Sequence, residues 1–255
     1  MLNYFFTHFN SFDLFVLLLA VISFLLLVFY QFYFFIKLSF NLSTESKFAK
    51  PLSIIICAKN EFDNLQKNLP VILAQDYPEF EVIVVNDQSI DNSKLFLEDL
   101  AKENSHLVVV NIDDFVTHPL GKKFALTLGI KTAKYEHLLL TDADCIPNSL
   151  DWASQMSSNF NDADIVIGYG AYEKKRGFLN KIIRFDTFNV AQHYLSFSLN
   201  RLTYMGVGRN LAYKKSLFFD NKGFASHIHI PSGDDDLFIQ QISANNNVAI
   251  EMLEC

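Results

Sequence analysis

Hydrophobic and polar positions fall in blocks along the chain, and the first block predicts a membrane-spanning helix. From Phe12 to Ile36, an apolar run is interrupted only by Asp13, Ser23 and Gln31. A helix of about 24 residues rises roughly 36 Å, which is enough to cross the hydrocarbon core of a bilayer. A cleaved signal peptide would have a shorter apolar region, a basic start and a small-residue cleavage site. A buried core helix is the weaker alternative, because the run is long and uniform.

Basic residues follow this run and none precedes it, since Lys37, Lys47 and Lys50 are the first in the chain. The positive-inside bias places the rest of the chain in the cytoplasm, as a single-pass protein of the inner (cytoplasmic) membrane. The expected organisation is a membrane anchor, a linker and one soluble domain, in that order: residues 1–37, 38–50 and 51–255.

After Pro51, short β-branched runs alternate with amphipathic segments that begin at polar turns. This pattern predicts strands over 52–57, 81–85, 107–110, 138–140, 164–168 and 247–253. It predicts helices over 61–75, 91–104, 122–133, 148–160, 178–199 and 234–243. Pro70 is expected to break or kink the first of these helices. The alternation of strand and helix predicts an α/β fold, with a parallel sheet flanked by helices.

The helix expected over 178–199 carries an apolar stripe at near-helical spacing, for which we prefer ordinary core packing. The stripe consists of Ile182, Ile183, Phe185, Phe188, Val190 and Leu195. The alternative is a helix that lies on the membrane beside the active site. The basic segment 174–176, just before it, is expected to be a solvated face or, as a weaker alternative, a contact with anionic headgroups.

Composition excludes some classes of function but does not identify one. The chain has 255 residues and a formal net charge of −7, which argues against a nucleic-acid partner. Its three cysteines show no Cys-x-x-Cys spacing, so we expect a reducing compartment and no disulfide framework. Cys57 lies in an apolar strand and is expected to pack as a small hydrophobic residue.

The strongest chemical signal is a pair of carboxylates at the end of a buried strand. Asp142 and Asp144 follow the run Leu138 to Leu140, and alternate side chains on an extended backbone point the same way. The two acids could therefore converge on one hard cation. Ligands of open parallel sheets bind beyond the carboxyl ends of the strands. The alternative is that Asp142 caps a turn while Asp144 is merely solvated.

Further polar clusters follow other strands, at Asn60 and Glu61 and at Asp87, and one opens the helix at Asp234. The first two should lie at the same sheet edge as Asp142, which suits a nucleotide whose pyrophosphate rests on a divalent metal. The cluster 234–236 would then be free to take a proton from an attacking hydroxyl. Helix capping is the alternative, although three consecutive acids exceed what capping needs.

Six segments match, in order and spacing, the motifs of one known family. An opening strand with an Asn-Glu turn covers residues 51–61, and an Asp-Asp-x-Ser-x-Asp stretch covers 84–93. A Gly-Lys-x-x-Ala-Leu segment follows at 121–126, and an Asp-x-Asp motif at 141–144. The last two are a Gly-x-x-x-Ala segment at 205–212 and a Glu-Asp-x-Asp-Leu motif at 233–237. From Pro51 onward the chain thus resembles the family 2 glycosyltransferases, with the GT-A (Rossmann-like, mostly parallel) fold. Asn86 replaces the usual first Asp, and Gly233 replaces the usual Glu.

The resemblance implies a nucleotide-sugar donor bound with Mn²⁺ or Mg²⁺. The donor-binding residues that it implies are Ala58, Asn60, Glu61, Asp87, Gly121, Lys122, Asp142 and Asp144. Among them, Asp142 and Asp144 would hold the metal, and Asp87 would contact the base or ribose. Registered on Leu237, the catalytic base falls on Asp234, and a register slip of one residue would place it on Asp235.

The resulting hypothesis is an inverting, metal-dependent glycosyltransferase that moves a sugar from a UDP-sugar to a lipid-linked or cell-surface glycan. A sugar nucleotidyltransferase is one alternative, but it would need a Gly-rich loop where the chain has the segment 58–61. An inactive scaffold is the other, and it predicts the loss of an acid cluster. Processive members of the family carry a Gln-x-x-Arg-Trp motif downstream of the base, and this sequence stops before one, as a truncated domain would.

Three lesser residues complete the expectations. His227 and His229 could form a metal pair, but without a third ligand at fixed spacing we expect a loop feature, with acceptor contact as an alternative. Trp152 is expected to pack in the core, and stacking on a sugar is its alternative.

Overall fold

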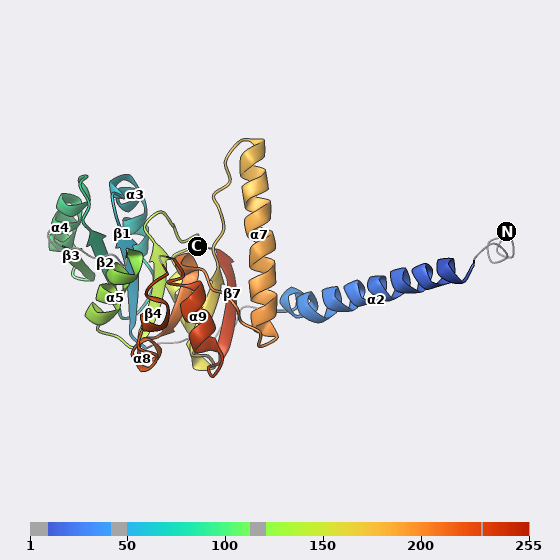
Figure 1. The fold of residues 1–255 in the computed structure, drawn as a ribbon. Helices are drawn as coiled ribbons and strands as arrows, with labels where there is room; N and C mark the ends of the chain where they lie inside the picture. Colours follow the sequence, from blue (N-terminus) through green and yellow to red (C-terminus); the bar gives the residue numbers. More distant parts are fainter. Residues whose placement is uncertain (1–9, 42–49, 113–120, 231, 255) are drawn as a thin grey trace. The chain divides into compact units, whose positions relative to one another are not determined.

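The computed structural model describes residues 10–41, 50–112, 121–230 and 232–254, and the chain divides into two compact units, Met1–Asn41 and Leu42–Cys255. The first unit is built on helix α2, Ser11–Ser39 (Figure 1). Within the described ranges, α2 is the one helix long and apolar enough to cross a bilayer, with a mean hydropathy of 2.9. The expected N-terminal apolar helix is therefore present. Most of the expected linker, residues 42–49, lies outside the described residues.

A capping box begins α2. The Asn10 side-chain oxygen accepts hydrogen bonds from the Phe12 and Asp13 backbone N–H groups at 2.9 and 3.0 Å, and Asp13 accepts from the Asn10 N–H at 3.0 Å. These bonds satisfy N–H groups that have no partner inside the helix.

The second unit is a seven-stranded sheet in the order β3-β2-β1-β4-β6-β5-β7, flanked by helices (Figure 1). Its strands are β1 Leu52–Ala58, β2 Phe80–Asp87, β3 Leu107–Ile112, β4 His137–Asp142, β5 Ile165–Tyr169, β6 Leu211–Lys214 and β7 Val248–Glu254. Its helices are α3 Phe62–Leu73, α4 Ser93–Glu103, α5 Lys122–Thr132, α6 Trp152–Ser158, α7 Phe178–Leu199, α8 Lys215–Asp220 and α9 Asp236–Ser243. The short 3-10 turns are η1 Asn159–Asn161, η2 Gly208–Asn210 and η3 Ala225–His227.

The sheet is mixed, because β6 runs antiparallel to both β4 and β5 while the other neighbouring strands are parallel. The mostly parallel α/β fold is confirmed, but neither β6 nor α8 was expected from the sequence. The four residues of β6 follow a Gly-x-Gly segment and are too few to show a period.

Alternate residues of the central strands serve opposite faces of the sheet. Ile54 and Ile56 belong to the core cluster that includes residues of α3, α4 and α6. Ile55 faces α5, where a Cβ added at Gly129 would lie 2.7 Å from its Cγ2. Burial on both faces explains why these strands read as continuous apolar runs.

The expected effect of Pro70 was wrong in one respect, since α3 is not broken there. The helix continues to Leu73, and the Ala74 N–H donates to the Pro70 carbonyl at 3.1 Å. Pro70 lies in the last turn and is exposed, so its ring lies at the protein surface. The loss of one N–H donor there is tolerated without ending the helix.

The preferred interpretation of the α7 stripe was also wrong. Of its six residues only Leu195 is buried, while the other five are exposed, in the range from 37% at Ile183 to 70% at Phe185. The first buried residue of the helix is Ala191. Only the C-terminal half of α7 therefore packs on the domain, beside β7 (Figure 1). The basic segment 174–176 is exposed, as expected.

Trp152 packs in the core, as expected, and its indole N–H donates to the Asn210 side-chain oxygen at 3.0 Å. The Asn210 amide in turn donates to the Tyr169 carbonyl at 3.0 Å. The fully buried Asn210 thus joins α6, β5 and η2.

Replacing this buried amide should destabilise the fold. We expect Asn210→Ala to lower the free energy of unfolding by about 2–4 kcal/mol, because it leaves the Trp152 N–H and the Tyr169 carbonyl without this partner. Urea unfolding followed by fluorescence measures this, since Trp152 is the only tryptophan. The control is Asn92→Ala at an exposed position, expected within about 0.5 kcal/mol of the original chain. Equal effects of both substitutions would contradict the assignment.

Candidate active site

Three parallel strands end at one edge of the sheet, and their register places the predicted acids there. Ala58 of β1 pairs with Asn86 of β2, and Cys57 pairs with Asp142 of β4. Asp87 is the last residue of β2, directly after Asn86. The strand register therefore brings Ala58, Asp87 and Asp142 together, as the sequence predicted.

The loops after β1 and β2 are bonded to one another. The Ile90 N–H donates to the Asn60 side-chain oxygen at 2.8 Å, and the Asn60 N–H donates to the Ser89 hydroxyl at 2.9 Å. Asn60 and Gln88 adopt positive φ angles of 56° and 53°. The side chain of Asn60 thus fixes the loop after β2 next to the strand ends. Asn60 itself has a positive φ, a backbone conformation that Asn tolerates well.

A cleft of about 350 Å³ opens at this edge. It is lined by Cys57, Ala58, Lys59, Glu61, Asp87, Gly121, Lys122, Ala125, Asp142, Ala143 and Asp144. Seven of the eight predicted donor-binding residues are among them. The eighth, Asn60, lines a neighbouring cleft of about 290 Å³, to which Glu61 also contributes.

Asp87 is held at the wall of this cleft by a cation that the sequence analysis did not single out. The Lys59 ammonium lies 3.8 Å from an Asp87 carboxylate oxygen, and the Asp87 side chain is largely buried. The neighbouring Asn86, which replaces the usual acid, donates to the Asn111 side-chain oxygen at 2.9 Å. Lys59 could have been noticed, since it lies in the turn directly after β1.

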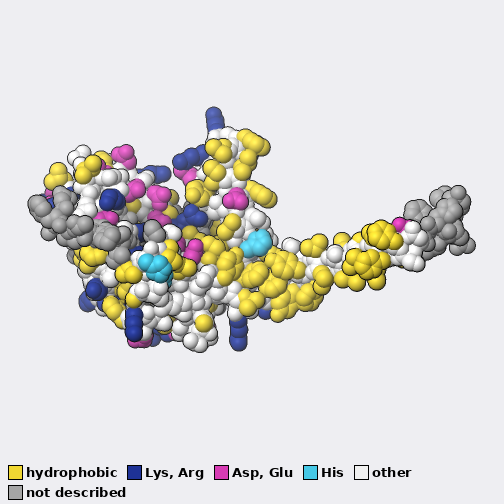
Figure 2. Space-filling model, in the orientation of Figure 1, with side chains coloured by type: hydrophobic (Ala, Val, Ile, Leu, Met, Phe, Trp, Pro, Cys, Tyr) yellow, Lys and Arg dark blue, Asp and Glu magenta, His cyan; other side chains and the backbone are white. Residues whose placement is uncertain are grey.

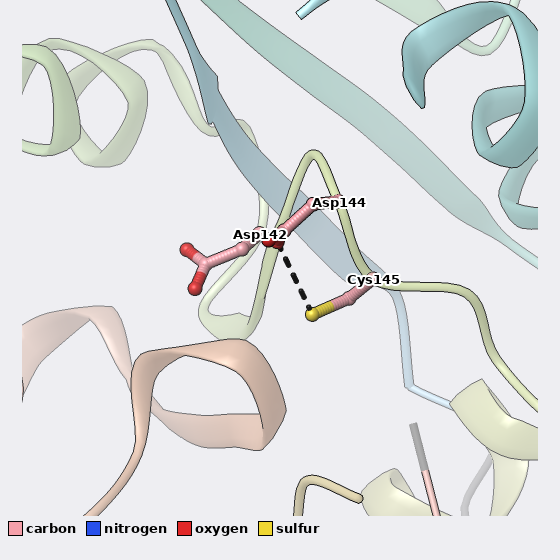
Figure 3. A group of neighbouring side chains, drawn as sticks. All are labelled: Asp142, Asp144 and Cys145. Carbon is pink, nitrogen blue, oxygen red and sulfur yellow. Dashed lines mark hydrogen bonds between the residues drawn. The ribbon is translucent and has the colours of Figure 1, made fainter. Parts of the chain in front are cut away.

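The end of β4 and the turn after it carry a group of side chains that could hold a divalent cation. Asp142, Asp144 and Cys145 offer ligand atoms that all lie within 4.8 Å of one another (Figure 3). The Cys145 thiol donates to an Asp144 oxygen at 3.7 Å. The two carboxylates fit a hard cation such as Mg²⁺ or Mn²⁺. Cys145 was not predicted to take part, although it directly follows the motif.

Lys122 joins two acids from distant parts of the chain. Its ammonium lies 2.6 Å from an Asp142 oxygen and 3.6 Å from an Asp234 oxygen. Burial lowers the pKa of Lys122, but the two carboxylates outweigh that effect and the net shift is upward. Lys122 is therefore fully charged at neutral pH. It is the first residue of α5, directly after Gly121, whose φ of 53° suits glycine.

The two candidates for the base have different partners. Asp235 accepts the Gly208 N–H at 2.9 Å on one oxygen and the Asp236 N–H at 2.8 Å on the other. It therefore ties η2 to the start of α9. Asp234 makes the longer contact with Lys122 and its side chain is 15% exposed. Both acids line a narrow space together with Cys57, Lys122 and Asp142.

Burial shifts the pKa of two further groups in this part of the site. Burial, with contributions from Asp235 and Asp234, raises the pKa of Asp236 to about 6. Burial raises the pKa of Cys57 to about 12, so its thiol stays protonated at neutral pH. Cys57 accordingly behaves as a small neutral side chain at the wall of the cleft.

A buried lysine, which the sequence analysis did not single out, holds the segment before Asp234. Lys123 is 2% exposed, and its ammonium donates to the His227 and Ile230 carbonyls, each at 2.8 Å. Burial lowers the pKa of Lys123. The sequence shows two adjacent lysines but does not show that one faces the cleft while the other is buried.

The two histidines do not form a metal group in the described part of the chain. His227 is buried, its Nδ1 lies 2.9 Å from the Ser226 hydroxyl, and burial lowers its pKa. Its neighbour His229 is exposed. His227 ends the short 3-10 turn η3, and His229 lies in the turn that follows.

The sequence profile described as Glycosyl transferase family 2 matches residues 53–220, more than half of the chain. The chain belongs to glycosyl transferase family 2. This family 2 chain is 36% identical, over 120 residues, to a poly-beta-1,6-N-acetyl-D-glucosamine synthase of Staphylococcus epidermidis, covering 45% of this chain and 28% of that protein. A synthase of the same name from Staphylococcus aureus is 31% identical over 134 residues, covering 51% and 31%. The chain thus matches less than a third of the length of these curated relatives.

Solved structures share the fold at low identity. The mannosyltransferase PcManGT of Pyrobaculum calidifontis, in complex with GDP-Man and Mn²⁺, has a TM-score of 0.67 at 20% identity, covering 88% of this chain and 63% of that one. S. aureus TarS 1-349 has a TM-score of 0.61 at 21% identity, covering 78% and 57%. TarS 1-349 has also been solved with UDP-GlcNAc, with a TM-score of 0.58 at 19% identity, covering 80% and 58%. These neighbours confirm the GT-A fold of this family 2 chain.

The contact made by Lys123 predicts a stability effect. Lys123→Met fills similar space but leaves two carbonyls without this donor, so the free energy of unfolding should fall by about 1–3 kcal/mol. Lys131→Met removes the same charge from an exposed position of α5 and should change it by less than about 0.5 kcal/mol. Urea unfolding of both variants, followed through Trp152, makes the comparison. Equal stability of the two would contradict the role given to Lys123.

Proposed function

We propose that this chain is an inverting glycosyltransferase that moves a sugar from a nucleotide-diphosphate sugar to an acceptor hydroxyl. The observation that supports this most directly is the juxtaposition at one sheet edge of a cleft of about 350 Å³, two neighbouring carboxylates and a separate acid. Asp142 and Asp144 line the cleft, while Asp234 lies across Lys122 from Asp142.

The donor is proposed to be a UDP-sugar that lies across the ends of β1, β2 and β4. Glu61 and Asp87 would face its nucleoside, and Lys122 would face its diphosphate. The structure of TarS with UDP-GlcNAc and the name of the staphylococcal synthases support a UDP-sugar. PcManGT, which was solved with GDP-Man, shows that the same fold also serves another nucleotide.

Mn²⁺ or Mg²⁺ is the proposed cofactor, held by Asp142 and Asp144. Their ligand atoms are close enough to share one ion, and the fold neighbour PcManGT was solved with Mn²⁺. When bound, the ion would neutralise charge on the departing diphosphate as a Lewis acid. The protein's part is to hold both carboxylates at the end of β4.

Asp234 is the proposed catalytic base. It would take the proton of the acceptor hydroxyl while the hydroxyl oxygen forms its bond to the anomeric carbon, on the face opposite the leaving nucleotide. The bond between that carbon and the diphosphate oxygen breaks, and its electron pair leaves with the nucleoside diphosphate. Asp235 is the weaker candidate, because both of its oxygens already accept backbone N–H groups.

The acceptor is proposed to be a lipid-linked or cell-surface glycan, reached from the cytoplasmic face of the inner membrane. Helix α2 has the length and composition of a single membrane span. The outer face of α7 adds a second apolar surface, because Phe178 and Leu179 are exposed along with the stripe. Basic residues lie next to it, at 174–176 and at Lys181 and Arg184, and suit anionic headgroups. Figure 2 shows the apolar side chains gathered along this helix.

The two alternative functions have less support. A sugar nucleotidyltransferase would need a Gly-rich loop after β1, and the segment 58–61 has no glycine. An inactive scaffold would be expected to have lost one of its acid clusters, whereas Asp87, Asp142 and Asp234 all stand at the site.

Substituting the two acids should separate donor binding from chemistry. Asp234→Asn should lower turnover of UDP-GlcNAc at least about 100-fold with little change in donor affinity, because only proton transfer is lost. Asp142→Asn should weaken Mn²⁺-dependent donor binding about 10-fold or more. UDP release and calorimetry measure the two effects.

Asp235→Asn serves as the neighbouring control for this pair. It should mainly lower stability, because its carboxylate bonds backbone groups. A full loss of turnover in Asp235→Asn at unchanged stability, with activity retained in Asp234→Asn, would move the base to Asp235.

The proposed contact between the exposed face of α7 and the membrane can be tested by tryptophan fluorescence. In a Trp152→Phe background, a tryptophan introduced by Phe185→Trp should be quenched when the full chain is reconstituted in vesicles with brominated acyl chains. The control is Leu95→Trp, an exposed position on α4, which packs at the β3 edge of the sheet. That tryptophan should remain unquenched. Equal quenching at both positions would contradict a specific membrane contact of α7.

A further inference from the structure

Lys122 occupies the position of a counter-ion between the proposed metal ligand and the proposed base. Its contact with Asp142 is a charge-assisted hydrogen bond at 2.6 Å, and its contact with Asp234 is an ion pair at 3.6 Å. The wall of η2 is close to it, since a Cβ added at Gly208 would lie 3.7 Å from the ammonium. The ammonium thus lies close to three separate segments of the chain: the end of β4, η2 and the residues just before α9.

This arrangement conflicts with metal binding at the same carboxylate. An ammonium group at hydrogen-bond distance takes up a lone pair of Asp142 and repels a divalent cation that approaches. The contact is nevertheless easy to break, because 42% of the Lys122 side chain and 34% of the Asp142 side chain are exposed. Exposed ion pairs of this kind contribute little to stability, so a better partner can displace one of the two groups.

We infer that Lys122 is a displaceable counter-ion that blocks Asp142 until the donor binds, so that divalent metal and nucleotide bind together rather than independently. This inference rests on the proposed function, because it takes Asp142 as a metal ligand and the cleft as the donor site. A diphosphate carries more negative charge than one carboxylate, and phosphate oxygens form strong hydrogen bonds with lysine.

The position of Lys122 on the helix suits such an exchange. It is the first residue of α5, and N–H groups of the first turn of a helix also attract anions. Its flexible four-carbon side chain allows the ammonium to change partners without movement of the backbone. The adjacent Lys123 is fixed in the interior by two carbonyls, so the start of the helix stays in place when Lys122 moves.

The test is a titration of the full chain with Mn²⁺ in the absence of nucleotide, read by the EPR signal of free Mn²⁺. Lys122→Met should bind Mn²⁺ at least about five-fold more tightly than the original chain, because a competing ion pair has been removed. Lys122→Gln, the second variant, should show the same direction. Lys122→Arg should keep the weak binding, and Lys131→Met, at an exposed position of the same helix, is the matched control.

A second titration, in the presence of UDP, completes the test. With UDP bound, the original chain should hold Mn²⁺ more tightly than Lys122→Met does, so the order of the two affinities should reverse. The gain of Lys122→Met without nucleotide should disappear in the double variant Lys122→Met/Asp142→Asn. Trp152 fluorescence shows that each variant is folded.

Unchanged nucleotide-free Mn²⁺ affinity in both Lys122→Met and Lys122→Gln would overturn the inference. The proposed function would survive that result, provided that UDP promotes Mn²⁺ binding and that Asp142→Asn weakens it. A chain that binds Mn²⁺ independently of Asp142 would instead overturn the metal role itself, and the inference with it.

Discussion

The ammonium group of Lys122 lies between carboxylates from two distant segments, and the candidate site depends on that contact. Asp142 arrives at the end of β4, and Asp234 arrives just before α9. Two like charges at this edge would repel one another in the absence of a cation. Lys122 supplies that cation from the start of α5, a helix that packs against β1 and β2.

Backbone contacts of neighbouring side chains keep these groups in place. Lys123 holds the carbonyls of His227 and Ile230, so the segment that leads to Asp234 is fixed from inside. Asp235 bonds the Gly208 N–H and thereby joins η2 to α9. Neither Lys123 nor Asp235 lines the cleft of about 350 Å³, but their contacts fix the positions of the acids. A reactive site needs rigid support of this kind.

Most of the fold and the acidic edge could be predicted from the sequence. Buried parallel strands give continuous apolar runs, so β1, β2 and β4 were evident, and the acids at their ends followed from the geometry of a parallel sheet. The predictions that failed concerned features that depend on tertiary packing. The four residues of β6 show no period, and the apolar stripe of α7 gives no indication that only its C-terminal half meets the domain.

The roles of individual side chains at the site could not be predicted from the sequence for the same reason. The sequence presents Lys122 and Lys123 as equivalent neighbours, whereas helix geometry points one into the cleft and buries the other. It left Asp234 and Asp235 as competing candidates for the base, whereas the coordinates give them different partners, which are Lys122 for Asp234 and two backbone N–H groups for Asp235. Partners contributed by remote segments carry no local signal, which is why these distinctions required coordinates.

The central claim is that Asp142 and Asp144 hold a divalent cation beside a bound diphosphate. The most direct measurement is a crystal structure of the full chain with UDP and Mn²⁺, with data collected to locate manganese by anomalous scattering. The account predicts a peak within about 2.5 Å of a carboxylate oxygen of Asp142 or Asp144, with the Lys122 ammonium turned to the diphosphate. A manganese peak elsewhere, with Lys122 still bonded to Asp142 while UDP fills the cleft, would contradict it.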